Sequence, residues 1–255
     1  MTSQLEHAEA FHALHVRGDP VVLFNVWDAG SAGAVAKAGA KAIATGSWSV
    51  ATANGYCDGE ATPLELVIAN VTRIVGAVQL PVTLDLEGGY GGSPQAVAET
   101  VMRLLATGAV GFNIEDQVIG GVGLHSIETQ SARIGAARDA AQAFGMPVFI
   151  NARNDFFLQS IEHDATLVDA ALERAHAYAK AGASGFFAPG LVEVRLIEKL
   201  CASSPLPVNL MMSPKSPSPA RLAELGAARI SHGPGPYRLA MRALADAARE
   251  AHSST

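Results

Sequence analysis

The sequence predicts an α/β fold, a single (β/α)8 TIM barrel that spans residues 1–255. Eight short apolar runs alternate with eight Ala-rich amphipathic stretches along the chain. The runs are nearly continuous, which is typical of parallel strands buried on both faces. Many of the amphipathic stretches end in a glycine that can close a helix, as Gly145 does in Phe-Gly-Met. A doubly wound open sheet shares this local order, and the number of units and the chain length favour the barrel.

The elements follow from the same pattern in order. The predicted strands are the apolar runs 21–27, 42–50, 81–86, 110–114, 147–152, 185–188, 207–211 and 229–231. The predicted helices are the amphipathic stretches 32–38, 63–78, 94–107, 133–144, 165–181, 192–202, 219–225 and 237–251. The last helix carries an apolar stripe that must be buried, either on its own barrel or on a second copy of the chain.

Composition excludes several classes of protein. The 255 residues include 18 Lys+Arg and 24 Asp+Glu, a net charge of −6, and no basic run that nucleic acid would need. No apolar stretch approaches the length of a membrane span, and the N-terminus does not resemble a secretory signal. Cys57 and Cys201 have neither metal-ligand nor disulfide-framework spacing. We therefore expect a cytoplasmic protein without nucleic-acid or membrane partners.

Carboxylates gather at the predicted ends of two neighbouring strands. Asp85 and Glu87 are two residues apart, so on a strand both would point into the barrel mouth, and Glu115 ends the next strand. Three converging carboxylates repel one another, and no lysine is near them in sequence. A hard divalent cation with oxygen ligands, Mg²⁺ or Mn²⁺, would resolve that repulsion. The alternative is that these acids are solvated loop charges or helix caps.

Other strand ends supply candidates for binding and proton transfer. Arg153 suits a substrate carboxylate or phosphate, or alternatively an ion pair with a neighbouring acid. The Gly46-Ser47-Trp48 segment could direct backbone N–H groups at a developing oxyanion, or be an ordinary turn. Further polar candidates at strand ends are Asn209, a substrate contact, and the loop histidines His125 and His232, proton carriers or merely solvated groups. Cys57, beside Asp58, is predicted to be a spectator thiol.

Taken together, these motifs resemble the isocitrate lyase/phosphoenolpyruvate mutase superfamily over nearly the whole chain. The segments that carry the resemblance are Asn25-Val26-Trp27-Asp28-Ala29-Gly30-Ser31-Ala32, Gly55-Tyr56-Cys57-Asp58, Asp85-Leu86-Glu87-Gly88-Gly89-Tyr90-Gly91, Asn113-Ile114-Glu115-Asp116-Gln117 and Asn151-Ala152-Arg153-Asn154-Asp155.

The resemblance implies a (β/α)8 barrel with Mg²⁺ in its mouth and a small 2-oxo or 2-hydroxy carboxylate as substrate, cleaved through an enolate. By motif, Asp85, Glu87 and Glu115 correspond to the metal shell, with Asp58 reaching the ion through water. Gly46, Ser47 and Trp48 correspond to carboxylate and oxyanion contacts, and Arg153 to the substrate-binding arginine. In this superfamily the last helix commonly crosses to a neighbouring subunit, so we expect a homodimer or homotetramer with residues 237–251 in the contact.

One loop departs from the resembled pattern. Lyase members carry a catalytic Cys where an ungapped reading places Gly123, and mutase and phosphonopyruvate hydrolase members carry a Lys and an Asn near Gly121 and Gly123. We therefore expect a Mg²⁺-dependent carbon–carbon lyase, of oxo-acid lyase or decarboxylase type, that needs little from the loop, with His125 as one proton carrier. The alternatives are a phosphonate enzyme, either phosphonopyruvate hydrolase or phosphoenolpyruvate mutase, and a catalytically silent oxo-acid-binding barrel.

Overall fold

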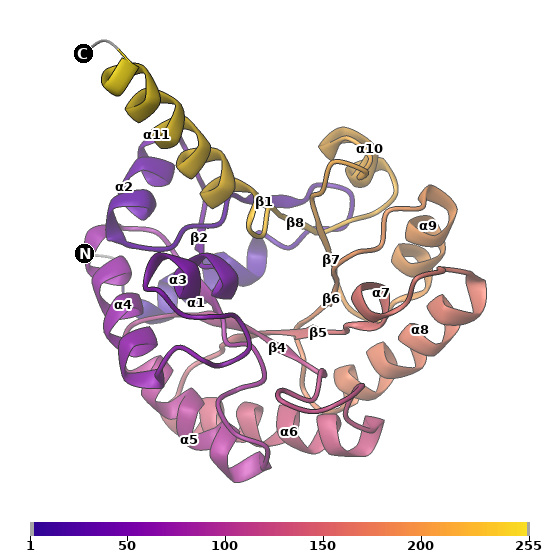
Figure 1. The fold of residues 1–255 in the computed structure, drawn as a ribbon. Coiled ribbons are helices and arrows are strands. Elements are labelled where there is room, and N and C mark those ends of the chain that lie inside the picture. Colours follow the sequence, from indigo (N-terminus) through magenta and orange to yellow (C-terminus); the bar gives the residue numbers. More distant parts are fainter. Residues whose placement is uncertain (1–2, 254–255) are drawn as a thin grey trace.

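A computed structural model describes residues 3–253 and shows eight parallel strands surrounded by helices (Figure 1). The strands are β1 (Val21–Leu23), β2 (Ile43–Ala44), β3 (Val82–Asp85), β4 (Gly111–Glu115), β5 (Phe149–Arg153), β6 (Gly185–Ala188), β7 (Val208–Met211) and β8 (Arg229–Ser231). The helices within the described part are α1 (Gln4–Ala13), α2 (Ala29–Lys37), α3 (Ser47–Ala53), α4 (Leu64–Ala77), α5 (Pro94–Leu105), α6 (Ile127–Phe144), α7 (Phe156–Gln159), α8 (Ala165–Lys180), α9 (Val194–Ser203), α10 (Pro219–Glu224) and α11 (Gly235–Ser253).

The strand order shows a nearly closed barrel. Each strand pairs in parallel with the next in the order β1-β8-β7-β6-β5-β4-β3-β2. Between β1 and β2 one parallel bridge, from Val26 to Thr45, takes the place of a longer ladder. The predicted barrel is confirmed, and the doubly wound alternative is wrong because β1 and β8 pair instead of forming separate edges.

Several sequence predictions are wrong in detail. The predicted strand 21–27 ends at Leu23, and beyond it only Val26 forms an isolated bridge. The predicted strand 42–50 ends at Ala44, and its second half forms α3, which begins after Gly46 as N-cap. The composition of residues 42–50 does not change where the strand ends and the helix begins, so the sequence pattern did not mark the boundary. An N-terminal helix, α1, was not predicted, although Ser3 and Glu6 form its capping box.

Helix α1 packs against the inner layer of the barrel through aromatic rings. Phe11 and His15 contact Phe149 of β5, with ring centroids 5.5 Å and 3.8 Å apart. His15 Nδ1 lies 2.7 Å from the Phe11 carbonyl oxygen, and the residue is 9% exposed. Burial, reinforced by the positive charge of Arg229, lowers the pKa of His15 to about 3.

This buried histidine predicts acid sensitivity. In the unfolded chain a histidine binds a proton near its ordinary pKa of about 6.5, whereas folded His15 does so only near pH 3. The stability that depends on neutral His15 is therefore present above about pH 6.5 and is lost as the pH falls, at up to about 1.4 kcal/mol per pH unit. We expect urea denaturation of His15→Gln to show a flatter decline between pH 6 and 4. The same change at exposed His176 should keep the wild-type slope; equal slopes for both variants would contradict this role.

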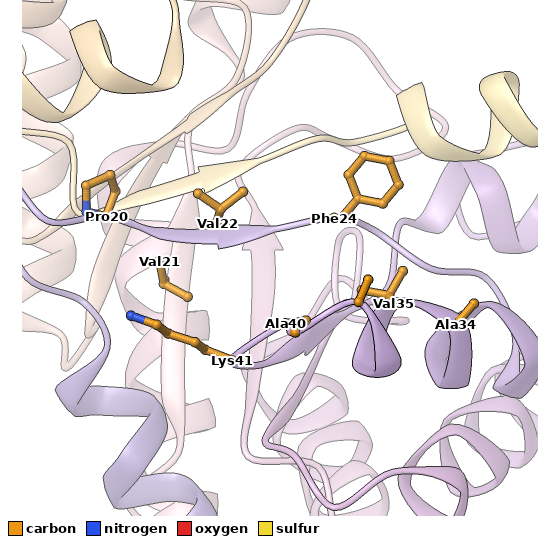
Figure 2. A pocket seen from close by; sticks show the side chains of 10 residues that line it. Pro20, Val21, Val22, Phe24, Ala34, Val35, Ala40 and Lys41 are labelled. Carbon is orange, nitrogen blue, oxygen red and sulfur yellow. The ribbon is translucent and has the colours of Figure 1, made fainter.

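Helix α11 leaves the barrel after its first turn (Figure 1). Pro236 is its buried residue, whereas Leu239 and Leu244 are 55% and 63% exposed. The outer face of β1 is correspondingly uncovered, with Val22 44% and Phe24 38% exposed. An apolar groove of about 530 Å³ lies between this face and α2 (Figure 2). Across residues 3–253, no helix is long and apolar enough to cross a membrane.

Candidate functional site

A cavity of about 370 Å³ opens at the carboxyl ends of the strands. This end of a (β/α)8 barrel is where active sites are found. Residues from most strand ends and from the first turns of two helices form its wall: Asn25, Gly46, Ser47, Trp48, Ser49, Asp58, Asp85, Asn113, Arg153, Leu158, Phe187, Pro189, Met211, Ser231, Gly233, Pro234 and Arg238. The cavity therefore collects six of the predicted site residues in one space.

The Gly46-Ser47-Trp48 segment forms the start of α3 at the cavity wall. The Gly46 N–H donates to the Val26 carbonyl, at 3.3 Å, and is not free for a ligand. The N–H groups of Ser47 and Trp48 lie in the first helical turn, where no intrahelical carbonyl is available. The Ser47 hydroxyl donates to Asp85 Oδ2, at 3.0 Å. This contact ties the start of α3 to the end of β3.

Asp85 is the carboxylate placed most directly at the cavity. Its Oδ2 accepts from Ser47, whereas its Oδ1 is buried and has no hydrogen-bond partner among the described residues. Asp58 lines the same cavity and is partly exposed to solvent. Burial of its carboxyl and the negative charge of Asp85 raise the pKa of Asp58. The two carboxylates therefore face one space, where their charges repel each other.

Glu87 does not follow Asp85 into the cavity. Strand β3 ends at Asp85, and Glu87 has a left-handed φ of 52°. Its side chain therefore no longer follows the alternation of sides that a strand would impose. Its Oε2 accepts the N–H groups of Gly59 and Glu60, at 2.7 Å and 2.6 Å. Burial raises the pKa of Glu87 to about 7. Glu87 is thus absent from the wall of the main cavity, but it lines a small neighbouring hollow together with Asp85.

The counter-charge for the strand-end acids is Arg153. Its guanidinium contacts Asp155 in a bidentate pair at 2.6 Å and 2.9 Å, and Glu115 at 2.7 Å. Asp85 Oδ2 is 3.8 Å away. Burial raises the pKa of Glu115, and the contact with Arg153 opposes that rise. A metal ion is therefore not the sole answer to the repulsion that the sequence suggests, since Arg153, at the end of the strand next to that of Glu115, already lies among these acids.

The donor set nevertheless fits a sparsely coordinated divalent cation. Across residues 3–253, no three His, Cys, Asp or Glu side chains form a ready-made metal cluster. Mg²⁺, however, is usually bound through one or two carboxylates and several waters. The unpartnered Oδ1 of Asp85, with Asp58 on the same cavity wall, supplies that kind of set.

Besides Glu87 and Glu115, three further predicted residues lie outside the cavity wall. His125 borders a separate hollow of about 130 Å³ with Glu60 and Arg133. The His232 ring packs on Phe24, with centroids 5.0 Å apart. Asn209 is 1% exposed beneath the cavity floor, where its Oδ1 accepts from the Ser231 hydroxyl.

The floor contains residues that sequence reasoning did not select. Asn113 Oδ1 accepts from Asn151 Nδ2, at 2.9 Å, and from Arg229 Nη2, at 3.3 Å. Asn25 Oδ1 accepts the backbone N–H groups of His232 and Gly233. The polar strand ends were visible in sequence, but which of them reach the cavity depends on the stagger of the strands. Nothing in the sequence marked Arg238 as a cavity residue, because it lies in the predicted last helix and not at a strand end.

Cys57 is exposed and is not part of the cavity wall. A catalytic thiol needs a neighbouring base or cation to form its thiolate, and the contacts of Cys57 show none among the described residues. We expect Cys57→Ser to change any turnover by less than about twofold, as measured by initial rates. A loss of several orders of magnitude with metal binding retained would instead assign the proton donor to Cys57.

Comparison with known proteins agrees with this architecture. The family model described as phosphoenolpyruvate phosphomutase matches residues 11–252. The chain belongs to the isocitrate lyase/phosphoenolpyruvate mutase superfamily, and the resemblance in its motifs is confirmed. It is 35% identical to an uncharacterized protein of Mycobacterium tuberculosis, over 94% of this chain and 88% of the other. It is 30% identical to 2-methylisocitrate lyase of Escherichia coli, over 78% and 68% of the two chains.

Other relatives include a decarboxylase and further solved structures. Oxaloacetate decarboxylase of Pseudomonas fluorescens is 31% identical over 71% of this chain, which spans 62% of that enzyme. A crystal structure from Burkholderia cenocepacia J2315, with a provisional assignment as a phosphonomutase, matches this fold with a TM-score of 0.95. The two sequences are 50% identical, and the match covers 98% of this chain and 100% of the other. The structure of 2,3-dimethylmalate lyase has a TM-score of 0.83 and 27% identity, covering 98% and 87%. The neighbours thus include both lyases and mutases.

Proposed function

We propose that the chain is a divalent-metal-dependent lyase that cleaves a carbon–carbon bond of a small 2-oxo or 2-hydroxy carboxylate. The observation that carries the proposal is the composition of the cavity wall. It combines Asp58, Asp85 and Arg153 with the polar start of α3, and its lining includes no thiol, lysine or imidazole. A reaction that needs a stabilised enolate and one proton carrier fits this set better than one that needs a dedicated acid on a lid.

The metal, Mg²⁺ or Mn²⁺, would be held by Asp85 through its free Oδ1, with Asp58 as a water-mediated contact. Glu87 accepts a hydrogen bond from a backbone N–H group, and Glu115 pairs with Arg153. Both would therefore hold the surrounding groups in place instead of binding the ion directly. When bound, the ion supplies positive charge that stabilises an enolate oxygen as the carbon–carbon bond breaks.

The chain's own groups orient the substrate and move the proton. The first-turn N–H groups of Ser47 and Trp48 would bind the carboxylate next to the 2-oxo group, and Arg153 would fix its plane. Asp58 would carry the proton, because its carboxyl lines the cavity in which the substrate would bind.

The loop 118–124 supports a limited catalytic role for the lid. It folds as a small hairpin in which the Val118 N–H donates to the Gly123 carbonyl, at 3.0 Å. Its residues Val118 and Ile119 border the hollow beside His125, not the main cavity. A phosphonate reaction would need cations for the phosphoryl group from such a loop, and residues 118–124 contain no Lys or Arg.

A substrate screen tests the proposal. Oxaloacetate, 2-methylisocitrate, 2,3-dimethylmalate and phosphonopyruvate are incubated with protein and Mg²⁺, and products are identified by NMR with an EDTA control. We expect Mg²⁺-dependent cleavage of at least one of the three di- or tricarboxylates. Turnover of phosphonopyruvate alone would favour the phosphonate alternative. Tight oxalate binding without any turnover would favour a silent binding barrel.

We also propose that a second copy of the chain covers the groove beside β1. Helix α11 has exposed Leu239 and Leu244, and the groove exposes Val22 and Phe24 (Figure 2). Two such chains can satisfy both surfaces by exchanging α11, which gives a closed twofold dimer, or a tetramer built from two dimers.

Light scattering of the full chain at micromolar concentration should therefore return a multiple of 26.3 kDa. Leu244→Glu should shift the population towards monomer, because it places a charge in the apolar contact. The same substitution at Leu158, exposed outside this groove, is the control. A wild-type monomer would contradict the exchange.

A further inference from the structure

Asp116 is a fully buried carboxylate that directly follows Glu115 at the end of β4. It does not line the cavity, and no step of the proposed reaction uses it. A buried carboxylate is costly unless it is paired and hydrogen-bonded. The two oxygens of Asp116 accept four hydrogen bonds, and its counter-ion is Arg174 of α8, whose Nη1 lies 3.1 Å from Oδ2. Asp116 is therefore the centre of a polar network built behind the cavity wall.

Helix α8 holds Asp116 from one side. Arg174 and Tyr178 are four residues apart and share one face of this helix. The Tyr178 hydroxyl accepts from Arg174 Nη1 and donates to Asp116 Oδ2, both at 2.8 Å. Burial and the negative charge of Asp116 raise the pKa of Tyr178, so the hydroxyl keeps its proton and stays a donor. The carboxylate of Asp116 is thereby fixed relative to α8.

On its other side, Asp116 holds the junction between β5 and α7. Its Oδ1 accepts the Asp155 N–H, at 3.0 Å, and its Oδ2 accepts from Asn154 Nδ2, at 2.8 Å. Asp155 precedes α7, but its side chain makes no hydrogen bond to that helix. The carboxylate of Asp155 instead holds the Nε edge of Arg153, whereas Glu115 contacts Nη1. Contacts therefore run from α8 through Asp116 and Asp155 to the Arg153 guanidinium.

We propose that Asp116, Arg174 and Tyr178 are positioning residues that fix the Arg153 guanidinium for a carboxylate in the cavity. The inference rests on the proposed function for the role of Arg153, and it adds which groups outside the cavity hold that side chain in its binding orientation. A long side chain that is already fixed loses less conformational entropy when it binds a ligand. Loosening the network should therefore weaken carboxylate binding although no residue that touches the ligand is changed.

Tyr178→Phe tests this chain of contacts, because it removes one hydroxyl and keeps the buried ring. Oxalate is titrated calorimetrically in the presence of Mg²⁺. Exchange of the Arg153 Nε–H with water is followed by NMR, with the signal assigned through its loss in Arg153→Lys. We expect oxalate to bind about fivefold or more weakly and the Nε–H to exchange faster. Arg174→Lys keeps the charge beside Asp116 and loses the planar fork, so it should show both changes to a smaller extent.

Ser184→Ala is the matched control. The Ser184 hydroxyl also accepts from a buried arginine, Arg138 Nη2 at 2.9 Å, but it lies just before β6, at the end of the barrel opposite the cavity. This variant should lower the melting temperature as Tyr178→Phe does. Its oxalate affinity should change by less than about twofold, and its Arg153 Nε–H exchange should stay at the wild-type rate.

Several results would overturn the proposal. Wild-type Nε–H exchange in Tyr178→Phe would show that the network does not hold Arg153, and faster exchange with unchanged oxalate affinity would show that this order does not serve binding. Equal weakening of oxalate binding in Ser184→Ala would assign the effect to general loss of stability. If the wild type binds no oxalate, the proposed function fails by itself, and the Nε–H comparison still decides whether Asp116, Arg174 and Tyr178 position Arg153.

Discussion

We expect replacement of Asp85 with asparagine to remove most turnover and the stabilisation by Mg²⁺. The buried Oδ1 of Asp85 has no partner among the described residues, so its charge is available to an ion. Ions that bind the folded chain alone stabilise it by mass action, by about 2.7 kcal/mol at a hundredfold excess over the dissociation constant. We therefore expect millimolar Mg²⁺ to raise the melting temperature of the wild type and to leave that of Asp85→Asn unchanged. Turnover should fall by about a thousandfold or more, since an essential charge contact is lost.

The control for this variant is Asp139→Asn, which neutralises an exposed carboxylate on α6. It should keep both the Mg²⁺-linked shift and the activity. A wild type that shows no shift at millimolar Mg²⁺, measured by calorimetry, would contradict the metal site. A retained shift in Asp85→Asn would place the ion elsewhere in the chain.

The second large effect is expected for Arg153→Met, measured by urea denaturation. Glu115 is 5% exposed and Asp155 is fully buried, and both depend on the Arg153 guanidinium. Removing one partner of a buried ion pair leaves an uncompensated charge and costs about 3–5 kcal/mol. The cost should shrink as the pH falls from 8 to 5. Unpaired buried carboxyls have raised pKa values, so the folded variant gains protons before the unfolded chain does.

Arg249→Met is the matched control. Arg249 pairs with Asp246 on the exposed surface of α11, with its side chain 74% exposed. Exposed pairs contribute between about 0 and 1 kcal/mol, so the control should unfold close to the wild type at every pH. A loss of similar size in both variants, or a deficit in Arg153→Met that grows in acid, would contradict the buried network.

The barrel could be predicted from sequence because its strands are buried on both faces. Runs such as 110–114 and 185–188 are continuously apolar, and the structure has β4 and β6 at nearly the same residues. The second predicted strand shows the limit of this reasoning. Residues 42–50 keep an apolar pattern across a change from strand to helix at Gly46, and nothing in their composition marks that change.

The sequence indicated which polar residues stand at the strand ends, but it did not indicate which of them contact one another. Asp85, Ser47 and Arg153 meet as expected, since the carboxyl ends of parallel strands converge. The position of Glu87 required the backbone φ after β3, and the neutralisation of Glu115 required the spatial neighbour Arg153. Arg238 reaches the cavity through the path of α11 out of the barrel, a tertiary feature with no local signature.

The most direct test of the central claim, that this cavity binds a metal and a 2-oxo carboxylate together, is an anomalous diffraction map. Crystals of the protein with Mn²⁺ and oxalate should show one strong peak beside the Asp85 carboxylate, with oxalate between that peak and the start of α3. A cavity without a peak, or a peak and oxalate at different places in the molecule, would contradict the proposed site.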